Sequence, residues 1–350
     1  MAPYPFGRVG SQRFRFEQYW DVLSSENQLE FQSFLSESDF DILYSKGNTV
    51  RKILGVLRGF LRRFFILFRI HRFQIIFIHR EAAPLGPPFF EWIIAKVLKK
   101  RIIYDFDDAI WLSNTSAENK IAALTKCHWK VKYICKWAWK ISCGNDFLSD
   151  YARLFNSNVV YIPTTLDLEL VDKQIISKKK LATKLTIGWT GTHSTLKYLQ
   201  AILPILQELE NEVDFEFVVI ADKNPLLPLK HFRFIPWKKA TEWSDLAQLQ
   251  IGLMPLGSKM WEEGKCGFKI LQYMALGIPA LASATNANQS IIIHNKNGFI
   301  CTNPEEWKTH LMDLIQNIEL KKLFAERGRK TLENGFSKKA LSEKYIELLS

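Results

Sequence analysis

Cysteine is scarce in this sequence, and the few cysteines form no metal-binding or redox motif. Their number is odd and no two stand in a C-x-x-C pair; they are Cys127, Cys135, Cys143, Cys266 and Cys301. This usage argues against a zinc site and against a disulfide framework. We therefore expect reduced thiols that act as small buried hydrophobic groups in the cytoplasm.

Long apolar runs are also missing. Residues 1–16 show no basic start followed by an apolar core and a small-residue cleavage site, so we expect no signal peptide. The most apolar window, residues 53–68, is interrupted by Arg58, Arg62 and Arg63. Arginines are costly in the middle of a bilayer, so a transmembrane helix is a poor interpretation.

Acidic residues are outnumbered by basic ones, 36 against 47, which leaves a formal net charge of +11. Such a balance favours polyanionic partners, namely phosphates, nucleic acid or anionic lipid. The hydrophobic fraction of 47% is ordinary for a globular protein. A chain of 350 residues is long for a single core, so two domains are expected.

Short β-rich runs alternate with helical patterns along the chain, which indicates an α/β fold with largely parallel sheets. We predict two Rossmann-like domains, over residues 1–165 and 185–335, joined by a lysine-rich linker at 166–184. A C-terminal helix follows at 336–350, for which packing back on the first domain is one option. Strands are expected at 29–34, 74–79, 101–106, 140–144, 158–163, 185–190, 215–220, 232–236, 251–256, 278–283 and 298–301.

The first Rossmann-like domain has an unusual beginning. Only Met1 to Tyr4 precede the turn that contains Gly7 and Gly10. The first strand is therefore very short or the chain is clipped, and we expect a defect in the centre of the first sheet.

Ligands of open α/β sheets gather beyond the carboxyl ends of the strands, so the residues after each strand are candidates. In "DFDDAIW", Asp105, Asp107 and Asp108 could orient a hydroxyl nucleophile or hold a divalent metal. Alternatively, Asp107 or Asp108 caps the following turn. Arg80 and Glu81 in "HREAAP" could likewise simply pair with each other.

Two helix beginnings in the second half are suited to an anion. "GWTGTHSTLKYL" (188–199) follows a strand, with Gly191 in the turn and Thr192 or Ser194 as N-cap. A plain capped helix fits that segment equally well.

The other beginning lies in "GKCGFKILQYMALGIPALAS" (264–283). It predicts a helix over 268–276 that ends with Gly277 in the left-handed C′ position and Pro279 after it. Lys265 and Lys269 stand at its N-terminus, where a lysine is mildly unfavourable unless an anion neutralises it. We favour a diphosphate there over two solvated surface lysines.

Residues 49–69 predict an amphipathic helix that carries two different faces. At 100° per residue, one stripe holds Arg51, Arg58, Arg62 and Arg69, and the opposite side holds Ile53, Leu57, Phe60, Leu61, Phe64 and Phe68. One interpretation is a surface helix that packs its apolar side on the sheet and leaves the arginines in water. No acidic residue occurs between Asp41 and Glu81, which indicates that the arginine face meets anionic lipid or an anionic acceptor.

Residues 126–143 mix lysines with Trp129, Tyr133, Trp137 and Trp139. Stacking on nucleic acid is one reading of such a mixture. Helical spacing instead favours most of these aromatics as core residues, and no nucleic-acid partner is expected.

Several blocks together resemble a known family. They are "APYPFGRVGSQRFR", "IYDFDDAIW", "GNDFLSDYA", "YIPTTLD", "IGWTGTHSTLKYL" and "GLMPLGSKMWEEGKCGFKILQYMALGIPALAS". The chain resembles the family-4 glycosyltransferases of the GT-B fold, also called glycosyl transferases group 1. These enzymes move a sugar from a nucleotide donor to an acceptor in the cleft between two Rossmann-like domains.

The resemblance implies a role for particular residues. The donor diphosphate would face Gly191, Thr192, Lys265, Cys266, Gly267, Phe268 and Lys269, and Asp107 or Asp108 would meet the acceptor hydroxyl. The acceptor side would further include Gly7, Gly10, Arg80, Glu81 and Asn145. No metal and no cofactor is implied, because the helix dipole and basic side chains stabilise the leaving diphosphate.

The sequence departs from the family at one place. Family members usually carry two glutamates with seven residues between them, and the matching positions are Gly264 and Gln272. Gln272 would accept a hydrogen bond from a ribose hydroxyl. Glu262 or Glu263 would stand in for the glutamate missing at position 264.

These observations lead to one hypothesis and one alternative. The hypothesis is a metal-independent, retaining hexosyltransferase at the inner face of the membrane, where it acts in surface polysaccharide or glycolipid synthesis. Its partners would be a nucleotide sugar, a glycan or lipid-linked acceptor and an anionic membrane surface. The alternative is a non-catalytic nucleotide-sugar or glycan-binding module that has lost the glutamate pair.

Overall fold

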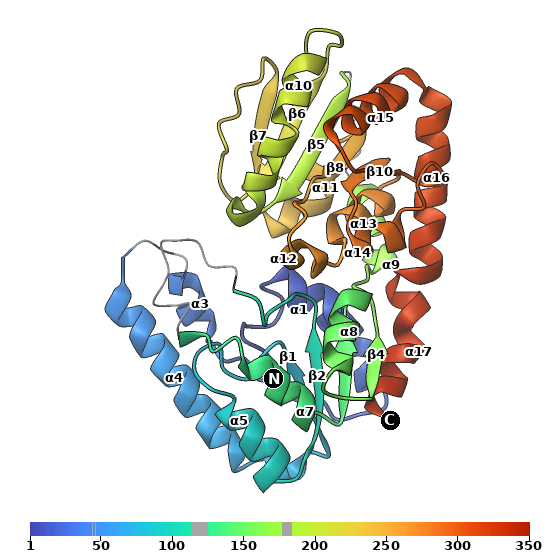
Figure 1. Ribbon diagram of the computed structural model, residues 1–350. Helices are drawn as coiled ribbons and strands as arrows, with labels where there is room; N and C mark the ends of the chain where they lie inside the picture. The colour runs from blue at the N-terminus through green and yellow to red at the C-terminus, as the bar shows by residue number, and fades with distance from the viewer. Residues whose placement is uncertain (44, 46, 114–124, 177–183) are drawn as a thin grey trace. The chain divides into compact units, whose positions relative to one another are not determined.

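The computed structural model describes residues 1–43, 45, 47–113, 125–176 and 184–350 (Figure 1). The chain divides into two compact units. The first contains Met1–Thr164, Gly264–Cys266 and Leu341–Ser350, and the second contains Thr165–Glu263 and Gly267–Ala340. In the described part of the chain, no helix is long and apolar enough to cross a membrane.

A four-stranded parallel sheet forms the centre of the first unit, in the order β1-β2-β3-β4. The strands are β1 Ile75–His79, β2 Arg101–Phe106, β3 Lys140–Cys143 and β4 Val159–Tyr161. All four were predicted from the alternation of short apolar runs. In register, His79 lies beside Asp105, and Asp105 beside Ser142, so polar residues of three strands line up at one end of the sheet.

The strand predicted at residues 29–34 is wrong. Within it only Ser33 makes an isolated bridge, to Ala2. The backbone partner of this segment is the short start of the chain, where the amide of Ala2 donates to the carbonyl of Gln32 at 3.0 Å. Arg63 also donates to the carbonyl of Gln32, and Arg62 donates to that of Phe34. Pro3 has no N–H group, so the ladder cannot continue along this segment.

The start of the chain extends this sheet for only two residues. The amide of His79 donates to the carbonyl of Met1 at 3.0 Å, and the amide of Phe34 to that of Ala2 at 2.9 Å. Pro3 and Pro5 follow, and proline has no N–H group to continue a ladder. The irregular part of the sheet therefore lies beside the edge strand β1, and the expected defect in the centre is wrong.

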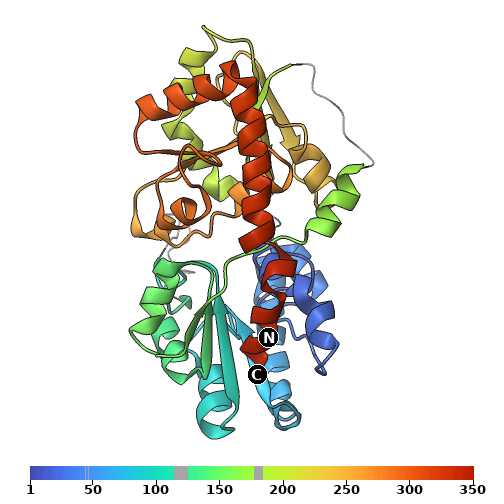
Figure 2. The ribbon, with the colours of Figure 1, turned by 90° about the vertical axis from the view of Figure 1, so that its right-hand side faces the viewer.

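Helices and short 3-10 or π turns surround the first sheet. They are α1 Gly10–Arg15, η1 Glu17–Tyr19, α2 Trp20–Ser24, α3 Glu37–Leu43, α4 Thr49–Leu67, η2 Ile70–Arg72, α5 Phe89–Trp92, η3 Ile93–Val97, α7 Lys130–Trp137 and α8 Asp146–Arg153. The end of α17 (Lys338–Leu349) also belongs to this unit. There the rings of Tyr19 and Tyr345 stack at 3.9 Å, and the hydroxyl of Tyr345 donates to the carbonyl of Arg15. Figure 2 shows α17 leading down to the C-terminus.

The second unit is built on a six-stranded parallel sheet in the order β10-β9-β8-β5-β6-β7. Its strands are β5 Thr186–Gly191, β6 Glu216–Ala221, β7 Phe232–Pro236, β8 Ile251–Met254, β9 Ala280–Ser283 and β10 Phe299–Cys301, all close to the predicted runs. The core contains the buried rings of Trp189, Phe215, Phe217 and Phe324.

Further helices of the second unit pack around this sheet. They are α9 Leu168–Ile176, η5 His193–Ala201, α10 Leu203–Leu209, η6 Lys239–Thr241, α11 Glu242–Leu246, α12 Met260–Glu263, α13 Phe268–Ala275, α14 Asn286–Ile291, α15 Pro304–Gln316 and α16 Ile318–Gly335. Helix α9 lies inside the segment expected to be a linker and is anchored by an ion pair from Asp172 to Arg329. Residues 177–183 of that segment lie outside the described residues.

Helix α4 packs with the opposite side to the one predicted. Its buried residues are Gly55, Gly59, Arg63 and Ile66, and its apolar stripe is exposed. Of the four stripe arginines, Arg58 pairs with Asp39, Arg69 pairs with Glu30 and Arg62 binds a backbone carbonyl, while Arg51 is exposed. The interpretation in which the apolar side packs on the sheet is therefore wrong.

The aromatic residues of 126–143 are not core residues as predicted. Helix α7 buries Lys130, Val131, Ile134 and Cys135. Trp129 is 50% exposed, and Tyr133, Trp137 and Trp139 are only partly buried. Trp129, Tyr133 and Trp137 thus lie along the surface of α7, whereas Trp139 follows the helix and packs against the core of the first unit.

Candidate functional site

A buried ion cluster in the first unit holds the carboxyl ends of three strands together. Asp105 at the end of β2 accepts hydrogen bonds from Arg15 of α1 and from Nδ1 of His79, the latter at 2.7 Å. All three side chains are inaccessible to solvent. Burial alone would raise the pKa of Asp105, but Arg15 and His79 hold that pKa well below its usual range.

Asp105 therefore has a structural role, and its partners were missed by sequence reasoning. Arg15 also donates to the hydroxyl of Ser142 at 3.0 Å and to the carbonyl of Ile162. No local sequence pattern predicts these contacts of Arg15, because α1 and β2 are far apart in the sequence. The cluster joins α1 to three strands and so positions the residues that follow β2.

Asp107 and Asp108 are paired with cations. Nε of Arg80 donates to Oδ1 of Asp107 at 2.8 Å, and Nζ of Lys265 lies 3.0 Å from Oδ2 of Asp108. Burial would raise the pKa of Asp107, but Arg80 and His79 lower it. Ionised carboxylates in this setting can accept a hydrogen bond from a hydroxyl and orient it. The alternative in which their side chains cap the next turn is wrong, since both form ion pairs instead.

The other residues predicted on the acceptor side have different surroundings. Asn145 lies beside Lys265, the partner of Asp108: its Nδ2 donates to the carbonyl of Lys265 at 3.0 Å, and its Oδ1 caps α8. Glu81 pairs with Lys130 at 2.7 Å, so the pairing of Arg80 with Glu81 is wrong. Gly7 has a left-handed backbone, and its amide donates to Glu17; Gly10 begins α1.

Residues Gly264–Cys266 pack closely within the first unit. The thiol of Cys266 donates to the carbonyl of Asp107 at 3.1 Å, and burial raises the pKa of that thiol. A Cβ atom built on Gly264 would lie 2.5 Å from Cβ of Ala109. A glutamate side chain therefore has no room at position 264 in this arrangement.

The predicted helix of the second unit is present as α13. It begins at Phe268 after Gly267, whose φ of 64° is left-handed, and ends before Gly277, whose φ is 66°. A residue with a side chain is strained in this left-handed region, which explains why both positions are glycine. Nζ of Lys269 in the first turn lies 5.5 Å from the centre of the Trp189 ring.

The Gly191–Thr192 turn lies at the end of β5 and leads into η5. The amide of Thr192 donates to Oγ1 of Thr195 at 3.1 Å, and the amide of Thr195 donates back to the carbonyl of Thr192 at 2.9 Å. A Cβ atom at Gly191 would lie 2.4 Å from the ring of Trp189. The sequence correctly predicts a helix start with Thr192 as N-cap, although the helix is a 3-10 helix.

Three buried polar atoms of the second unit have no hydrogen-bond partner among the described residues. They are Nε1 of Trp189, Oε2 of Glu262 and Oδ1 of Asn288. Glu262 is 3% exposed and uses only Oε1, which accepts from the hydroxyl of Tyr198 at 2.6 Å. Asn288 uses its Nδ2, which donates to the carbonyl of Ser283. Buried polar atoms without partners are rare in proteins, and a bound water, ion or ligand can satisfy them.

The side chains of Trp189 and Asn288 lie at the N-terminus of α13. Trp189 lies beneath Lys269, and Oδ1 of Asn288 would be 3.5 Å from a Cβ atom at Gly267. Glu263 differs from Glu262, because its Oε2 accepts from the amide of Asn286 at 2.9 Å. Of the two glutamates expected to replace position 264, Glu262 is thus the one with an oxygen available. Sequence reasoning missed Trp189 and Asn288.

Gln272 faces the interior of the second unit. Its Nε2 donates to Oε1 of Glu242 at 3.2 Å, and both side chains are 4% exposed. In the described part of the chain, no three His, Cys, Asp or Glu side chains form a group that could hold a metal ion.

Known proteins match both the sequence and the fold. Residues 184–317 match the family described as glycosyl transferases group 1. This stretch, less than half of the chain, is similar to the glycosyltransferases of group 1. The finding confirms the resemblance based on the sequence blocks. A glycosyltransferase of Methanocaldococcus jannaschii, MJ1178, is 24% identical, and the alignment covers 59% of this chain and 62% of that relative.

Solved structures resemble the chain outside residues 184–317 as well. A glycosyltransferase from Rickettsia africae has a TM-score of 0.66 at 14% identity and covers 99% of this chain and 96% of its own. HepE from Anabaena, in complex with UDP-glucose, has a TM-score of 0.63 at 13% identity, with 82% and 81% covered. The fold is therefore GT-B, as the resemblance implied.

Proposed function

We propose that the protein is a glycosyltransferase that moves a hexosyl group from a nucleotide-diphosphate sugar to a glycan or glycolipid acceptor. The observation that carries this proposal is the set of unpartnered buried atoms of Trp189, Glu262 and Asn288, of which the side chains of Trp189 and Asn288 lie at the N-terminus of α13, where Lys269 stands. The HepE complexes with UDP and with UDP-glucose support a nucleotide-sugar donor by analogy.

In this proposal the second unit binds the donor. The first turn of α13 and Lys269 neutralise the diphosphate, with the Gly191–Thr192 turn beside β5 as a second contact. Oε2 of Glu262 accepts a hydrogen bond from a sugar hydroxyl. Oε1 of Gln272 accepts a hydrogen bond from a ribose hydroxyl, while its Nε2 donates to Glu242.

The acceptor hydroxyl would meet the carboxylates of the first unit. Asp107 pairs with Arg80 and Asp108 with Lys265, and one of the two carboxylates accepts a hydrogen bond from the hydroxyl and orients it. The leaving diphosphate is stabilised by a helix terminus and a lysine, an electrostatic contribution that needs no divalent ion. We accordingly propose transfer without metal and, by analogy with the family, with retention at the anomeric carbon.

The natural setting of this activity is proposed as surface polysaccharide or glycolipid synthesis at the inner face of the membrane. The basic charge of the chain supports an anionic surface as a partner.

A donor panel tests the proposal. Full-length protein is incubated with nucleotide-diphosphate sugars that differ in base and sugar, with and without EDTA, and release of the nucleotide diphosphate is measured. We expect one donor to be turned over, with EDTA having no effect, and Lys269→Ala to lower turnover by roughly a hundredfold. Lys322→Ala on α16, whose lysine is 64% exposed, serves as the control and should keep full turnover.

Two results would contradict the proposal in different ways. Binding of a nucleotide diphosphate without transfer or hydrolysis of any donor would favour the non-catalytic binding module. Unchanged turnover in Lys269→Ala would remove the diphosphate assignment at α13.

A further inference from the structure

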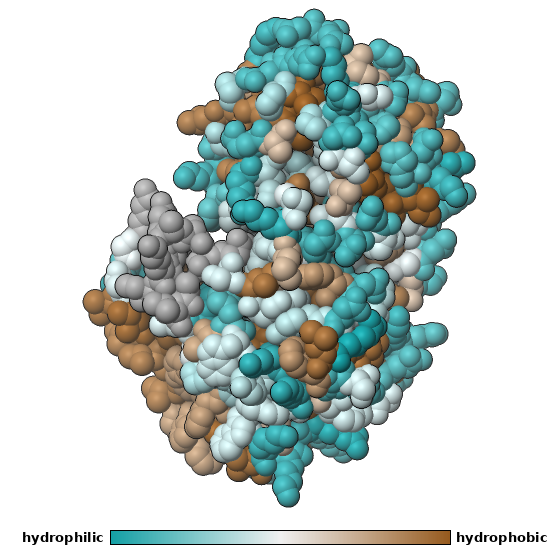
Figure 3. Space-filling model, viewed as in Figure 1, coloured by the Kyte–Doolittle hydropathy of each residue, from teal (hydrophilic) through white to brown (hydrophobic). Residues whose placement is uncertain are grey.

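Helix α4 presents a row of large apolar side chains to solvent. Phe65 and Phe68 are 64% and 65% exposed, and Leu57 and Leu61 are 53% and 57% exposed. Val50, Ile53, Leu54 and Phe64 complete this row, which we call the α4 apolar face. Figure 3 shows it as a continuous hydrophobic strip along α4. Contiguous apolar surface of this kind marks an interaction site in folded proteins.

The packing of the opposite side holds this face outward. Cβ atoms at Gly55 and Gly59 would lie 2.9 Å from the carboxylate of Asp39 and 2.5 Å from the ring of Phe34. Arg63, 1% exposed, donates to the carbonyls of Ala82 and Ala2 at 2.7 and 2.8 Å. Rotating the helix to bury the apolar row would break these contacts, so the exposure is built into the fold.

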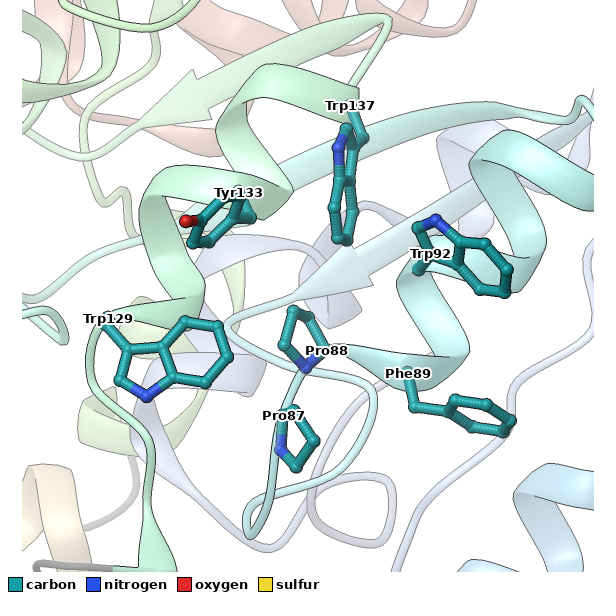
Figure 4. A pocket seen from close by; sticks show the side chains of 7 residues that line it. All are labelled: Pro87, Pro88, Phe89, Trp92, Trp129, Tyr133 and Trp137. Carbon is teal, nitrogen blue, oxygen red and sulfur yellow. The ribbon is translucent and has the colours of Figure 1, made fainter.

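Aromatic residues next to α4 enlarge the apolar surface. Helix α5 lies beside α4, with the rings of Phe60 and Phe90 6.1 Å apart. Between α5 and α7 lies a pocket of about 270 Å³, lined by Pro87, Pro88, Phe89, Trp92, Trp129, Tyr133 and Trp137 (Figure 4). Phe89 and Trp92 are also 52% and 44% exposed. Tryptophan and tyrosine are enriched where proteins meet the membrane interface.

The charges around this surface identify its occupant. Exposed cations flank the apolar residues at both ends of α4 and after η3, namely Arg51, Arg72, Lys96, Lys99 and Arg101. No acidic residue lies between Asp41 and Glu81. Glu30, Asp39 and Glu81 are each paired with a basic side chain. A second copy of the chain would bring like charges together, whereas anionic lipid headgroups would neutralise them.

We propose that α4 lies in the interface of an anionic lipid bilayer, with its apolar face among the acyl chains and the flanking cations at the headgroups. The aromatic pocket between α5 and α7 takes hydrocarbon from the same bilayer. This binding mode differs from that expected from the sequence, because the arginine stripe is largely used within the protein and the apolar side makes the contact. The inference rests on the proposed function only for the reason that a lipid-linked acceptor lies at a membrane.

Vesicle flotation of the full-length protein tests this inference. Wild type should float with vesicles of phosphatidylglycerol and phosphatidylcholine and bind weakly to phosphatidylcholine alone. The double variant Leu57→Ser and Leu61→Ser should bind roughly tenfold more weakly, because two half-exposed leucines no longer enter the bilayer. The control is Leu226→Ser in the second unit, where leucine is 79% exposed and no vesicle contact is expected.

A second readout localises the pocket. Brominated acyl chains in the vesicles should quench tryptophan fluorescence of wild type, and Trp92→Phe together with Trp129→Phe should reduce the quenched fraction. High salt distinguishes insertion of the apolar face from purely electrostatic adsorption. Vesicle binding by insertion persists at high salt once formed, whereas binding by adsorption is lost.

Three outcomes would overturn the inference. One is absence of wild-type binding to the anionic vesicles, and another is equal binding by the leucine double variant. The third is self-association that the same double variant abolishes, with no vesicle binding, which would make a second copy the occupant. Donor turnover is measured separately without vesicles, so a failed glycosyltransferase assay and a failed flotation assay are distinguishable.

Discussion

Gly59 of α4 lies directly against the ring of Phe34, so that a Cβ atom at position 59 would be 2.5 Å from Cε1 of that ring. Phe34 is completely buried and has little freedom to move aside. This contact draws the helix close through its small residue and leaves the apolar face outside. The position of one glycine thus decides which side of α4 is available to a partner.

Gly59→Ala should destabilise the protein even though alanine is the better helix former. We expect the free energy of unfolding to fall by about 1 to 3 kcal/mol, because the added methyl group displaces the Phe34 ring. Urea unfolding followed by circular dichroism measures the change. Gly335→Ala at the end of α16 is the matched control, since nothing lies within 4 Å of a Cβ atom there. It should be neutral or slightly stabilising, and an equal loss at both sites would contradict the prediction.

Arg63→Met should lower the free energy of unfolding more than the same substitution at an exposed arginine of α4. It removes the donor for the carbonyls of Ala2, Gln32 and Ala82 while keeping much of the side-chain volume. The carbonyls of Ala2 and Gln32 keep backbone donors, whereas that of Ala82 loses its arginine donor, so we expect a loss of roughly 2 kcal/mol in the free energy of unfolding. Arg51→Met should change it by less than about 0.5 kcal/mol. Thermal and urea unfolding measure the stability of the Arg63→Met and Arg51→Met variants. Equal stability of the two variants would show that the hydrogen bonds of Arg63 do not stabilise the fold.

Asp105→Asn should lower the free energy of unfolding by an amount that depends on pH. The pKa of Asp105 is held below its usual value, so its ionised form stabilises the fold above the unfolded pKa of about 3.9. That stabilisation is lost as the pH falls through the lower folded pKa. Near pH 7 we expect a loss of about 3 to 5 kcal/mol, because Arg15 stays buried without its partner. Wild type and variant should converge as the pH is lowered.

The control for this prediction is Asp150→Asn, whose carboxylate is 73% exposed and pairs with Arg153 on the same helix. Its unfolding free energy should stay within about 0.5 kcal/mol of wild type at every pH. A difference between wild type and Asp105→Asn that is constant from neutral to acid pH would show that ionisation of Asp105 contributes nothing.

Glu262→Gln tests the unpartnered oxygen of the proposed donor site. The substitution keeps the shape but turns Oε2 into an amide group that donates, so it no longer accepts from a sugar hydroxyl. We expect donor turnover to fall by roughly ten- to a hundredfold, with affinity for the nucleotide diphosphate nearly unchanged. Turnover and calorimetric binding of the nucleotide diphosphate are measured on the same preparation.

Tyr198→Phe separates the sugar contact from support of the glutamate. It removes only the hydroxyl that donates to Oε1 of Glu262, so turnover should fall less than in Glu262→Gln. A cost of about 1 kcal/mol in unfolding free energy is expected. If both variants lose turnover equally, the role of Glu262 is structural.

Local patterns in the sequence predicted most of the regular structure and part of the site. Apolar runs bounded by turn residues located the strands from β1 to β10, and Gly277 with Pro279 correctly ended α13. The exception at residues 29–34 arises because this segment pairs only with the first residues of the chain, where Pro3 and Pro5 have no N–H group to extend a ladder. The cap at Thr192 was predictable because it depends on residues only three positions apart.

The sequence by itself determined the α/β rhythm, the GT-B resemblance and the presence of one arginine side and one apolar side on residues 49–69. Only the tertiary structure decided which side packs inward, that Glu81 binds Lys130, and that Glu262 rather than Glu263 keeps an unpartnered oxygen. The physical reason is the separation along the chain over which each interaction acts. Periodicity and capping act between near neighbours, whereas burial and ion pairing join residues that are distant along the chain, and their energies depend on which partners the fold brings within contact.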